Sequence, residues 1–206
     1  MHIQILNQGY GNSKSLSIAL QKIKHNLEIE HLAHVPKKTT KHPDFLFLPG
    51  VGNFGHAMRT LRAGGWDDYI QLLIEKGVTV VGICLGLQLF ADSSEEAPGV
   101  QGLGLISGHV RKLEANLSRV PNTGWRSIVE IQKSADIPWD FTKRTFYFTH
   151  SYYLDVRDKE FVRATSYHGD KEFPAMIYKD NIIATQFHIE KSGHDGLELL
   201  RWIIEK

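Results

Sequence analysis

The segment of residues 78–90 constrains the chain most, because it joins a β-branched apolar run to a helical pattern through the only cysteine. The run ends at Gly82, Cys84 follows, and Gly86 opens the helical pattern. Such a sharp strand-to-helix turn, a nucleophile elbow, exposes a reactive side chain, and flanking glycines let neighbouring backbone approach closely. The positive end of the helix favours a thiolate over a thiol. The segment therefore predicts a nucleophilic cysteine; the alternative is a small buried hydrophobic residue.

Length and composition exclude several classes of protein. The 206 residues suit one domain, 1–206, and 42% hydrophobic with 23% charged residues is typical of a soluble globular chain. A net charge of +1 predicts neither a nucleic-acid-binding face nor a membrane-attracted surface. One cysteine allows no internal disulfide and the N-terminus carries no secretion signal, so we expect a cytoplasmic protein. No apolar run is long enough to span a bilayer, and we expect no metal ion and no cofactor.

The order of strand and helix patterns predicts an α/β fold. In the first half, strands at 2–6, 28–32, 45–48 and 78–83 alternate with helices at 56–63, 66–76 and 85–92, with a glycine-bearing turn at 7–12. We expect Ser13 to cap a further helix that carries Leu16, Leu20 and Ile23 on one stripe. In the second half, short β-like runs lie at 125–131, 146–149, 151–156, 161–167, 174–179 and 182–187, before a helix at 195–205 with an apolar stripe of Leu197, Leu200, Trp202 and Ile204. We expect a mixed, mostly parallel central sheet flanked by helices, with an antiparallel extension in the C-terminal half. In such sheets the reactive site lies at the carboxyl ends of the strands, where Cys84 stands.

A candidate base for Cys84 follows the last strand pattern. His188 ends the apolar strand 182–187, and Glu190 comes two positions later. A histidine at the end of a strand can face a thiolate that ends a neighbouring strand, and the glutamate can accept its other ring proton. The alternative is a surface-loop histidine beside an unrelated carboxylate.

A candidate oxyanion turn follows strand 45–48. Its residues Gly50, Val51 and Gly52 allow a backbone N–H to point at a developing oxyanion, with the amide of Leu85 as the second donor. Taken alone, it is an ordinary glycine turn. Because nucleophile, base and turn all fall at strand ends of one predicted sheet, together they indicate acyl transfer through a thioester.

Two motifs resemble those of the class I (triad-type) glutamine amidotransferases. Residues 82–88, Gly-Ile-Cys-Leu-Gly-Leu-Gln, resemble the nucleophile motif of that family. Residues 186–190, Gln-Phe-His-Ile-Glu, are similar to its His-Pro-Glu motif. The resemblance runs from residue 11 to the last helix and so covers essentially the whole chain.

Further segments are similar to one branch of this family, the HisH glutaminase subunits of imidazole glycerol phosphate synthase. Residues 48–55 and 148–153 resemble that branch, and residues 120–125 together with Lys191 match it in part. The resemblance assigns oxyanion and substrate contacts to Gly50, Val51, Gly52, Leu85, Gln88, His150, Ser151 and Tyr152. It assigns contacts at a subunit interface to Asn12, Trp125 and Lys191.

The resemblance also implies a mechanism and a partner. Cys84 attacks the side-chain amide of L-glutamine, His188 protonates the departing ammonia, Glu190 holds the imidazole, and water hydrolyses the glutamyl thioester. The ammonia passes to a HisF-like (β/α)8-barrel cyclase, which uses it to form imidazole glycerol phosphate and an aminoimidazole carboxamide ribotide in histidine biosynthesis.

Departures from the family pattern leave the ammonia acceptor open. Ile189 replaces the usual proline between base and acid, Asn122-Thr123 stands where His-Met is common, and residues 7–10 differ from the usual Asp-Tyr-Gly-Met type. A second hypothesis is therefore a paralogous subunit that feeds ammonia to an enzyme modifying surface-polysaccharide sugars. A third is a non-catalytic relative that only docks to a partner, against which the complete catalytic set argues.

Overall fold

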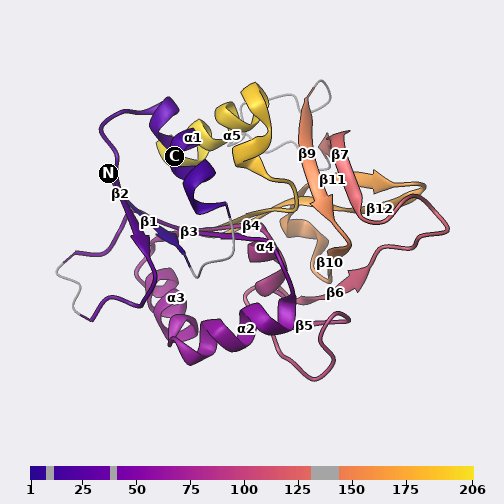
Figure 1. Cartoon of the computed structure of the whole chain (residues 1–206), viewed down its shortest axis with the longest axis horizontal. Coiled ribbons are helices and arrows are strands. Elements are labelled where there is room, and N and C mark those ends of the chain that lie inside the picture. Colours follow the sequence, from indigo (N-terminus) through magenta and orange to yellow (C-terminus); the bar gives the residue numbers. More distant parts are fainter. Residues whose placement is uncertain (8–11, 38–40, 131–143) are drawn as a thin grey trace.

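The computed structural model describes residues 1–7, 12–37, 41–130 and 144–206 and has an eight-stranded central sheet (Figure 1). Its strand order is β2-β1-β3-β4-β13-β12-β11-β8. These strands are β1 (His2–Leu6), β2 (Glu28–Leu32), β3 (Phe45–Gly50), β4 (Thr79–Cys84), β8 (Val129–Glu130), β11 (Val162–His168), β12 (Lys171–Lys179) and β13 (Ile182–Thr185). The pairs from β2 to β13 are parallel, and those from β13 to β8 are antiparallel. The predicted α/β fold with a mixed, mostly parallel sheet is confirmed.

The strand β13 lies beside the elbow strand β4, although the two are far apart in the sequence. They pair in parallel, with Ala184 opposite Gly82. On its other side β4 pairs in parallel with β3, which places Gly50 opposite Cys84. Because parallel strands end at the same edge of a sheet, the residues that follow β3, β4 and β13 meet at one edge.

Helices cover both faces of the sheet (Figure 1). The helices are α1 (Ser13–Ile23) and α5 (Gly193–Glu205) on one face, and α2 (Phe54–Ala63) and α3 (Trp66–Glu75) on the other. Neighbouring residues of β3 enter different cores, since Phe47 belongs to the cluster that contains Leu199 and Leu46 belongs to the one that contains Met58. This burial on both faces explains the continuous apolar runs of the central strands. Among the described residues, no helix is long and apolar enough to span a bilayer.

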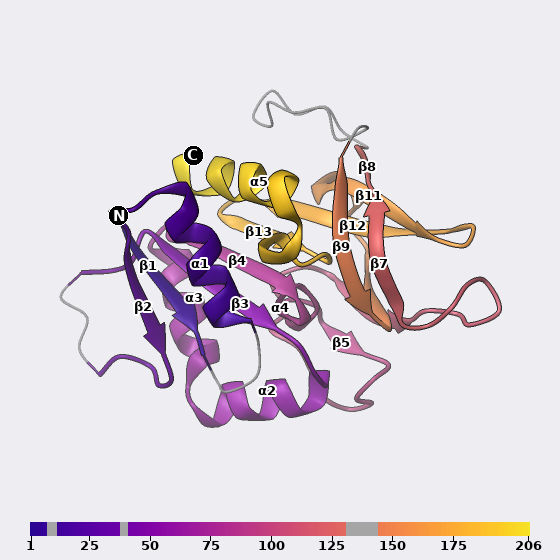
Figure 2. The same cartoon turned by 45° about the horizontal axis from the view of Figure 1, so that its top comes forward.

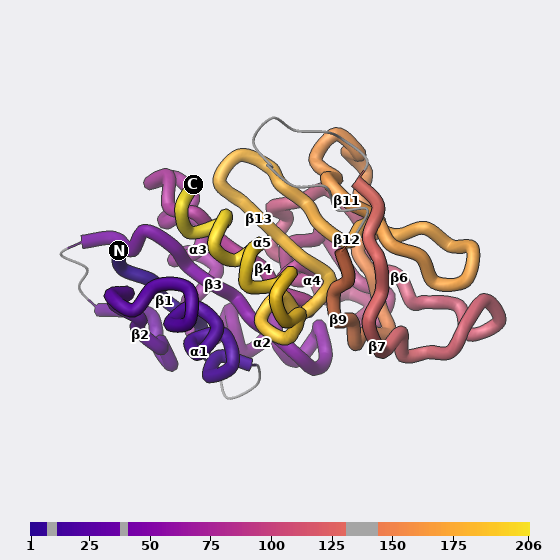
Figure 3. Tube along the Cα trace, turned by 90° about the horizontal axis from the view of Figure 1, so that it is seen from above, coloured from indigo at the N-terminus to yellow at the C-terminus, as the bar shows by residue number. Residues whose placement is uncertain are grey.

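Two smaller sheets lie beyond the central one. One pairs β7 (Asn122–Ser127) with β9 (Thr145–His150), and the other has the order β10 (Tyr152–Val156), β6 (Gly108–Lys112), β5 (Ser93–Ser94). Figure 2 shows β7 and β9 as a ribbon beside β11 and β12, and Figure 3 shows both termini at the opposite end of the molecule. Since only Ser151 separates β9 from β10, this short connection joins the two smaller sheets.

Several expected helix boundaries are wrong: α2 begins at Phe54 and not at 56, and α5 begins at Gly193 and not at 195. The N-cap of α1 is Asn12 and makes no side-chain cap hydrogen bond, so Ser13 is the first helical residue and not its cap. Helix α4 spans Leu85–Leu89 and not 85–92. The backbone oxygens at its end accept hydrogen bonds from the loop at 102–106, which stops the helix from continuing.

The buried stripe of α5 contains only two of the four residues expected in it, Leu200 and Ile204. Its buried apolar residues are Leu199, Leu200, Ile203 and Ile204. Leu197 and Trp202 are partly exposed. The observed stripe joins residues four positions apart, which lie above one another on a helix, whereas the expected stripe spread around it.

The structure has two strands that the sequence patterns did not predict. β5 and β6 were not expected, because β6 alternates buried and partly exposed positions over only three residues. The run expected at 125–131 divides into β7 and β8. Its last residue lies outside the described residues, as do residues 8–11 of the expected turn at 7–12.

Gly86 lies where the elbow helix packs against β3. A Cβ at this position would lie 1.9 Å from the backbone oxygen of Leu48. We expect Gly86→Ala to lower the free energy of unfolding by about 3 kcal/mol, because the backbone of β3 or α4 must move to admit the methyl group. Urea denaturation followed by circular dichroism measures this loss.

The control for that substitution is Gly99→Ala. A Cβ at Gly99 would meet nothing within 4 Å, but its φ is +82°. The expected loss is therefore only the strain of a left-handed alanine, about 1 kcal/mol. Equal losses for the two variants would contradict the steric explanation at Gly86.

Candidate active site

Cys84 occupies a strained turn between β4 and α4. Its φ of 55° and ψ of −103° are unusual for a residue with a side chain, and among the described non-glycine residues only Asp180 also has a positive φ. The flanking glycines permit the turn, since a Cβ at Gly82 would lie 2.6 Å from the ring of Phe90. The strand–turn–helix geometry of a nucleophile elbow is therefore present.

His188 and Glu190 form a buried pair beside Cys84. His188 Nδ1 lies 2.8 Å from Glu190 Oε1, and the two side chains are 2% and 0% exposed. Asn12 Nδ2 donates to the same carboxylate oxygen over 3.1 Å. His188 Nε2 is buried and has no hydrogen-bond partner among the described residues, which leaves this atom for the sulfur. The structure thus brings together Cys84, His188 and Glu190.

The neighbours of His188 determine its charge. Burial opposes the charged ring, but the nearby Cys84, the hydrogen bond to Glu190 and the negative charge of both groups raise the pKa of His188 to about 10. The ring is therefore an imidazolium at neutral pH, and it compensates a negative charge on the sulfur. A thiolate beside an imidazolium supplies a nucleophile and a proton donor, which are the two groups that acyl transfer needs.

A pocket of about 270 Å³ opens at Cys84. Its lining consists of Val51, Gly52, Cys84, Leu85, Gln88, Glu96, Pro121, Thr149, His150, Ser151 and Tyr152. The residues expected to contact oxyanion and substrate all line it except Gly50, which lies opposite Cys84 in β3. The sequence interpretation missed Glu96, Pro121 and Thr149. No sequence motif surrounds Glu96, so only the folded structure shows that it lines the pocket. There its carboxylate accepts a 2.6 Å hydrogen bond from the backbone N–H of Phe54.

His150 is held in its neutral form at the wall of this pocket. Its Nδ1 lies 2.8 Å from the backbone oxygen of Tyr152, to which it can only donate, and its Nε2 accepts from Asn122 Nδ2 over 3.0 Å. Burial lowers the pKa of His150 to about 4, although the bond to Tyr152 favours the charged ring. His150 therefore adds no second positive charge near His188.

The residues expected at a subunit interface lie around the turn Ile189–Lys191. Trp125 is 50% exposed, and a Cβ at Gly193, just after this turn, would lie 3.6 Å from its ring. Lys191 is an exposed residue of the turn itself. Asn12 reaches the turn through its bond to the glutamate. The three residues therefore border the buried pair.

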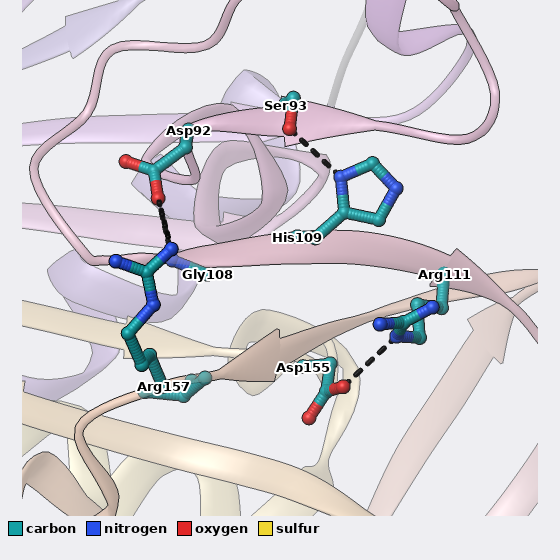
Figure 4. A pocket seen from close by; sticks show the side chains of 8 residues that line it. Asp92, Ser93, Gly108, His109, Arg111, Asp155 and Arg157 are labelled. Atoms are coloured by element: carbon teal, nitrogen blue, oxygen red, sulfur yellow. Dashed lines mark hydrogen bonds and ion pairs between the residues drawn. The ribbon is translucent and has the colours of Figure 1, made fainter.

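A second cavity, of about 300 Å³, lies among β5, β6 and β10 (Figure 4). Arg111 Nε lies 2.9 Å from Asp155, and Arg157 lies 3.9 Å from Asp92. Because each guanidinium group faces a carboxylate, this cavity has little net charge to attract a ligand. Over the described part of the chain, no group of His, Cys, Asp and Glu has an arrangement that could hold a metal ion. The candidate active site is therefore the pocket at Cys84.

The charge of His188 can be tested through its two partners. Cys84→Ala removes the sulfur and Glu190→Gln removes the carboxylate charge, so we expect the pKa of His188 to fall below about 10 in both variants. Nitrogen chemical shifts of the ring, followed by NMR as the pH is changed, measure this. His109→Gln in the second cavity serves as control and should leave the titration unchanged. A titration unaffected by Cys84→Ala would contradict the assigned contact.

Comparisons with known proteins agree with this site. The chain matches the sequence model of the family "Glutamine amidotransferase class-I" over residues 4–205. It is 37% identical over 205 residues to the "Imidazole glycerol phosphate synthase subunit HisH" of Thermotoga maritima, covering 100% of this chain and 97% of that relative. It is 35% identical over 212 residues to the "Imidazole glycerol phosphate synthase hisHF" of Emericella nidulans, covering 98% of this chain and 38% of that relative.

A solved structure described as "Crystal structure of glutamine amidotransferase" has the same fold, with a TM-score of 0.74 at 19% identity over 98% of this chain and 97% of that one. The family match spans nearly the whole chain, and the HisH relative is covered almost completely. The chain therefore belongs to the class I glutamine amidotransferases, in the branch that contains the HisH subunits.

Proposed function

We propose that the chain is the glutaminase subunit of an imidazole glycerol phosphate synthase and hydrolyses glutamine through a thioester at Cys84. The observation that carries this proposal is the buried pair of His188 and Glu190, 2.8 Å apart, beside Cys84 at a pocket large enough for an amino acid. The full-length likeness to HisH subunits supports it. That likeness also favours the histidine pathway over a paralogue serving surface polysaccharides.

In the proposed mechanism, the sulfur of Cys84 attacks the side-chain carbonyl carbon of glutamine. His188 gives its Nε2 proton to the leaving nitrogen and the carbon–nitrogen bond breaks. Ammonia departs, and the glutamyl group remains bound to the sulfur as a thioester. The neutral ring then takes a proton from the water that attacks the thioester, and glutamate departs as the sulfur regains its electron pair. Glu190 stays ionised and keeps the ring oriented through Nδ1.

Backbone amides around the pocket are the proposed oxyanion donors. Gly50 is paired with Cys84 in the sheet, and Val51 and Gly52 continue from it into the pocket lining. Gly52 has a φ of +119°, which a residue with a side chain rarely adopts. The amide of Leu85, directly after the nucleophile, is the second donor.

Recognition of the free amino acid falls to the remaining lining residues. Glu96 is the single carboxylate in the lining, and we propose that it binds the α-ammonium group of glutamine. Its Oε2 accepts from the backbone N–H of Phe54, which holds the carboxylate in place. Gln88 and the segment His150, Ser151 and Tyr152 enclose the rest of the substrate.

We further propose that Asn12, Trp125 and Lys191 face a HisF-like (β/α)8-barrel cyclase that receives the ammonia. A partner on this surface would contact Asn12, whose side chain is bonded to Glu190, and would thereby reach the catalytic pair. The longer relative named hisHF supports a partner of this kind. A role in docking alone is disfavoured, because a surface that only docks has no need of a buried thiol–imidazolium pair.

Cys84→Ala tests the role of the nucleophile. In the complex with the cyclase, we expect glutamine-dependent turnover to fall by at least about a thousandfold, because no other thiol exists to form the thioester. Turnover with added ammonium salt should be unchanged, since the cyclase then needs no glutaminase. Product formation with each nitrogen source is the measurement. Equal loss with both sources would refute the assigned role.

Glu96→Gln tests the contact with the substrate ammonium. We expect KM for glutamine to rise about tenfold with a smaller change in kcat, because a charge-assisted hydrogen bond becomes a neutral one. The matched control is Glu95→Gln, since Glu95 faces Arg111 and does not line the pocket. A rise in KM shared by both variants would argue against a specific contact at Glu96.

A further inference from the structure

Gln186 is a buried polar residue that the mechanism above leaves unused. It directly follows β13, two positions before His188, and its side chain is 0% exposed. A buried amide without partners would cost about 1–3 kcal/mol, so its contacts explain why a polar side chain stands at the end of an apolar strand.

Hydrogen bonds around Gln88 determine which end of the Gln186 amide faces the nucleophile. The backbone oxygen of Tyr152 can only accept, and it lies 2.8 Å from Gln88 Nε2, so Gln88 presents its NH2 group on this side. The same NH2 group lies 3.3 Å from Gln186 Oε1 and donates to it. The NH2 group of Gln186 must therefore point the other way, and there its Nε2 lies 3.8 Å from Cys84 Sγ.

The two polar neighbours of the sulfur have opposite effects on its charge. The backbone oxygen of Thr149, 3.9 Å from Sγ, can only accept and so favours the protonated thiol. The NH2 group of Gln186 can only donate, and a donor gains more from an anion than from a neutral acceptor. Gln186 therefore favours the thiolate.

We infer that Gln186 donates a hydrogen bond to the thiolate of Cys84 and, through its carbonyl oxygen, holds Gln88 in the glutamine pocket. Both protons of the Gln88 amide are then directed at protein acceptors, so only its carbonyl oxygen remains for the substrate. One buried amide thus connects the nucleophile to substrate recognition. The inference rests on the proposed glutaminase function.

Other titratable groups around the sulfur must be kept constant in a test. They are His188 and Glu190 after β13, His150 and Tyr152 from β9 and β10, and Glu96 across the pocket. Substitutions at Gln186 leave all of them in place.

The pH dependence of alkylation separates this role from a merely structural one. Because the chain has a single cysteine, the mass added to the full-length protein by iodoacetamide reports on Cys84 alone. For Gln186→Leu we expect the alkylation rate on the acidic limb of the profile, where the thiol predominates, to fall about tenfold, and for Gln186→Glu further, because a carboxylate repels the thiolate. In alkaline solution the rates should converge with that of the unchanged protein, since the thiol then ionises without help.

A difference in KM between the two variants tests the contact of Gln186 with Gln88. Gln186→Glu keeps an oxygen that accepts from Gln88, so KM for glutamine should rise less than in Gln186→Leu. The matched control is Ser166→Ala in β11, which removes a partly buried 2.9 Å hydrogen bond to the backbone oxygen of Ser127 in β7. Its alkylation profile should be unchanged.

An alkylation profile for folded Gln186→Leu that overlays the profile of the unchanged protein would overturn the inference. If that variant does not fold, Gln186→Met gives the same decision, because methionine has a similar length and no donor. Neither outcome bears on the glutaminase proposal, which depends on glutamine turnover by Cys84→Ala and not on alkylation.

Discussion

The parallel pairing of β13 with β4 is the constraint on which the rest of the site depends. It aligns two strands that are distant in sequence, so that Cys84 and the residues before His188 leave the sheet at the same edge. Strand β9 then holds His188 in place, because the backbone N–H of His188 donates to the backbone oxygen of Tyr147 over 2.8 Å. Ser192 joins the same two residues, donating to the oxygen of His188 over 2.7 Å and accepting from the N–H of Tyr147 over 3.0 Å.

The electrostatics of the site follow from this arrangement. A carboxylate and an imidazole with almost no exposure are costly to bury, and each is tolerated because the other compensates it. The raised pKa of His188 is the measure of that compensation. His150, which lines the pocket, does not add to this cost, because both of its nitrogens are hydrogen-bonded and burial keeps it neutral.

The departures from the family pattern have structural explanations at two positions. Ile189, where a proline was expected, is 2% exposed and packs into the core beside α5, while the turn Ile189–Lys191 is closed by a backbone hydrogen bond from Lys191 to His188. Asn122, where a histidine is common, is buried and donates to His150. Both positions therefore contribute to the site with different side chains.

The sequence by itself determined the α/β class, the nucleophile elbow and the candidate oxyanion turn, because these depend on local signals: an apolar run, a cysteine between glycines, and turn residues at strand ends. The resemblance to the family, and not a local signal, supplied Gln88 and the segment 150–152 of the pocket lining. The sequence could not determine that β13 inserts beside β4, nor that Glu96, Gln186 and Asn12 reach the pocket or its catalytic pair, because no local pattern marks a residue whose partner is distant in sequence. The sequence also did not predict the buried stripe of α5 or the end of α4 correctly. Their limits depend on which neighbouring backbone and core each helix meets, and only the folded chain brings those neighbours together.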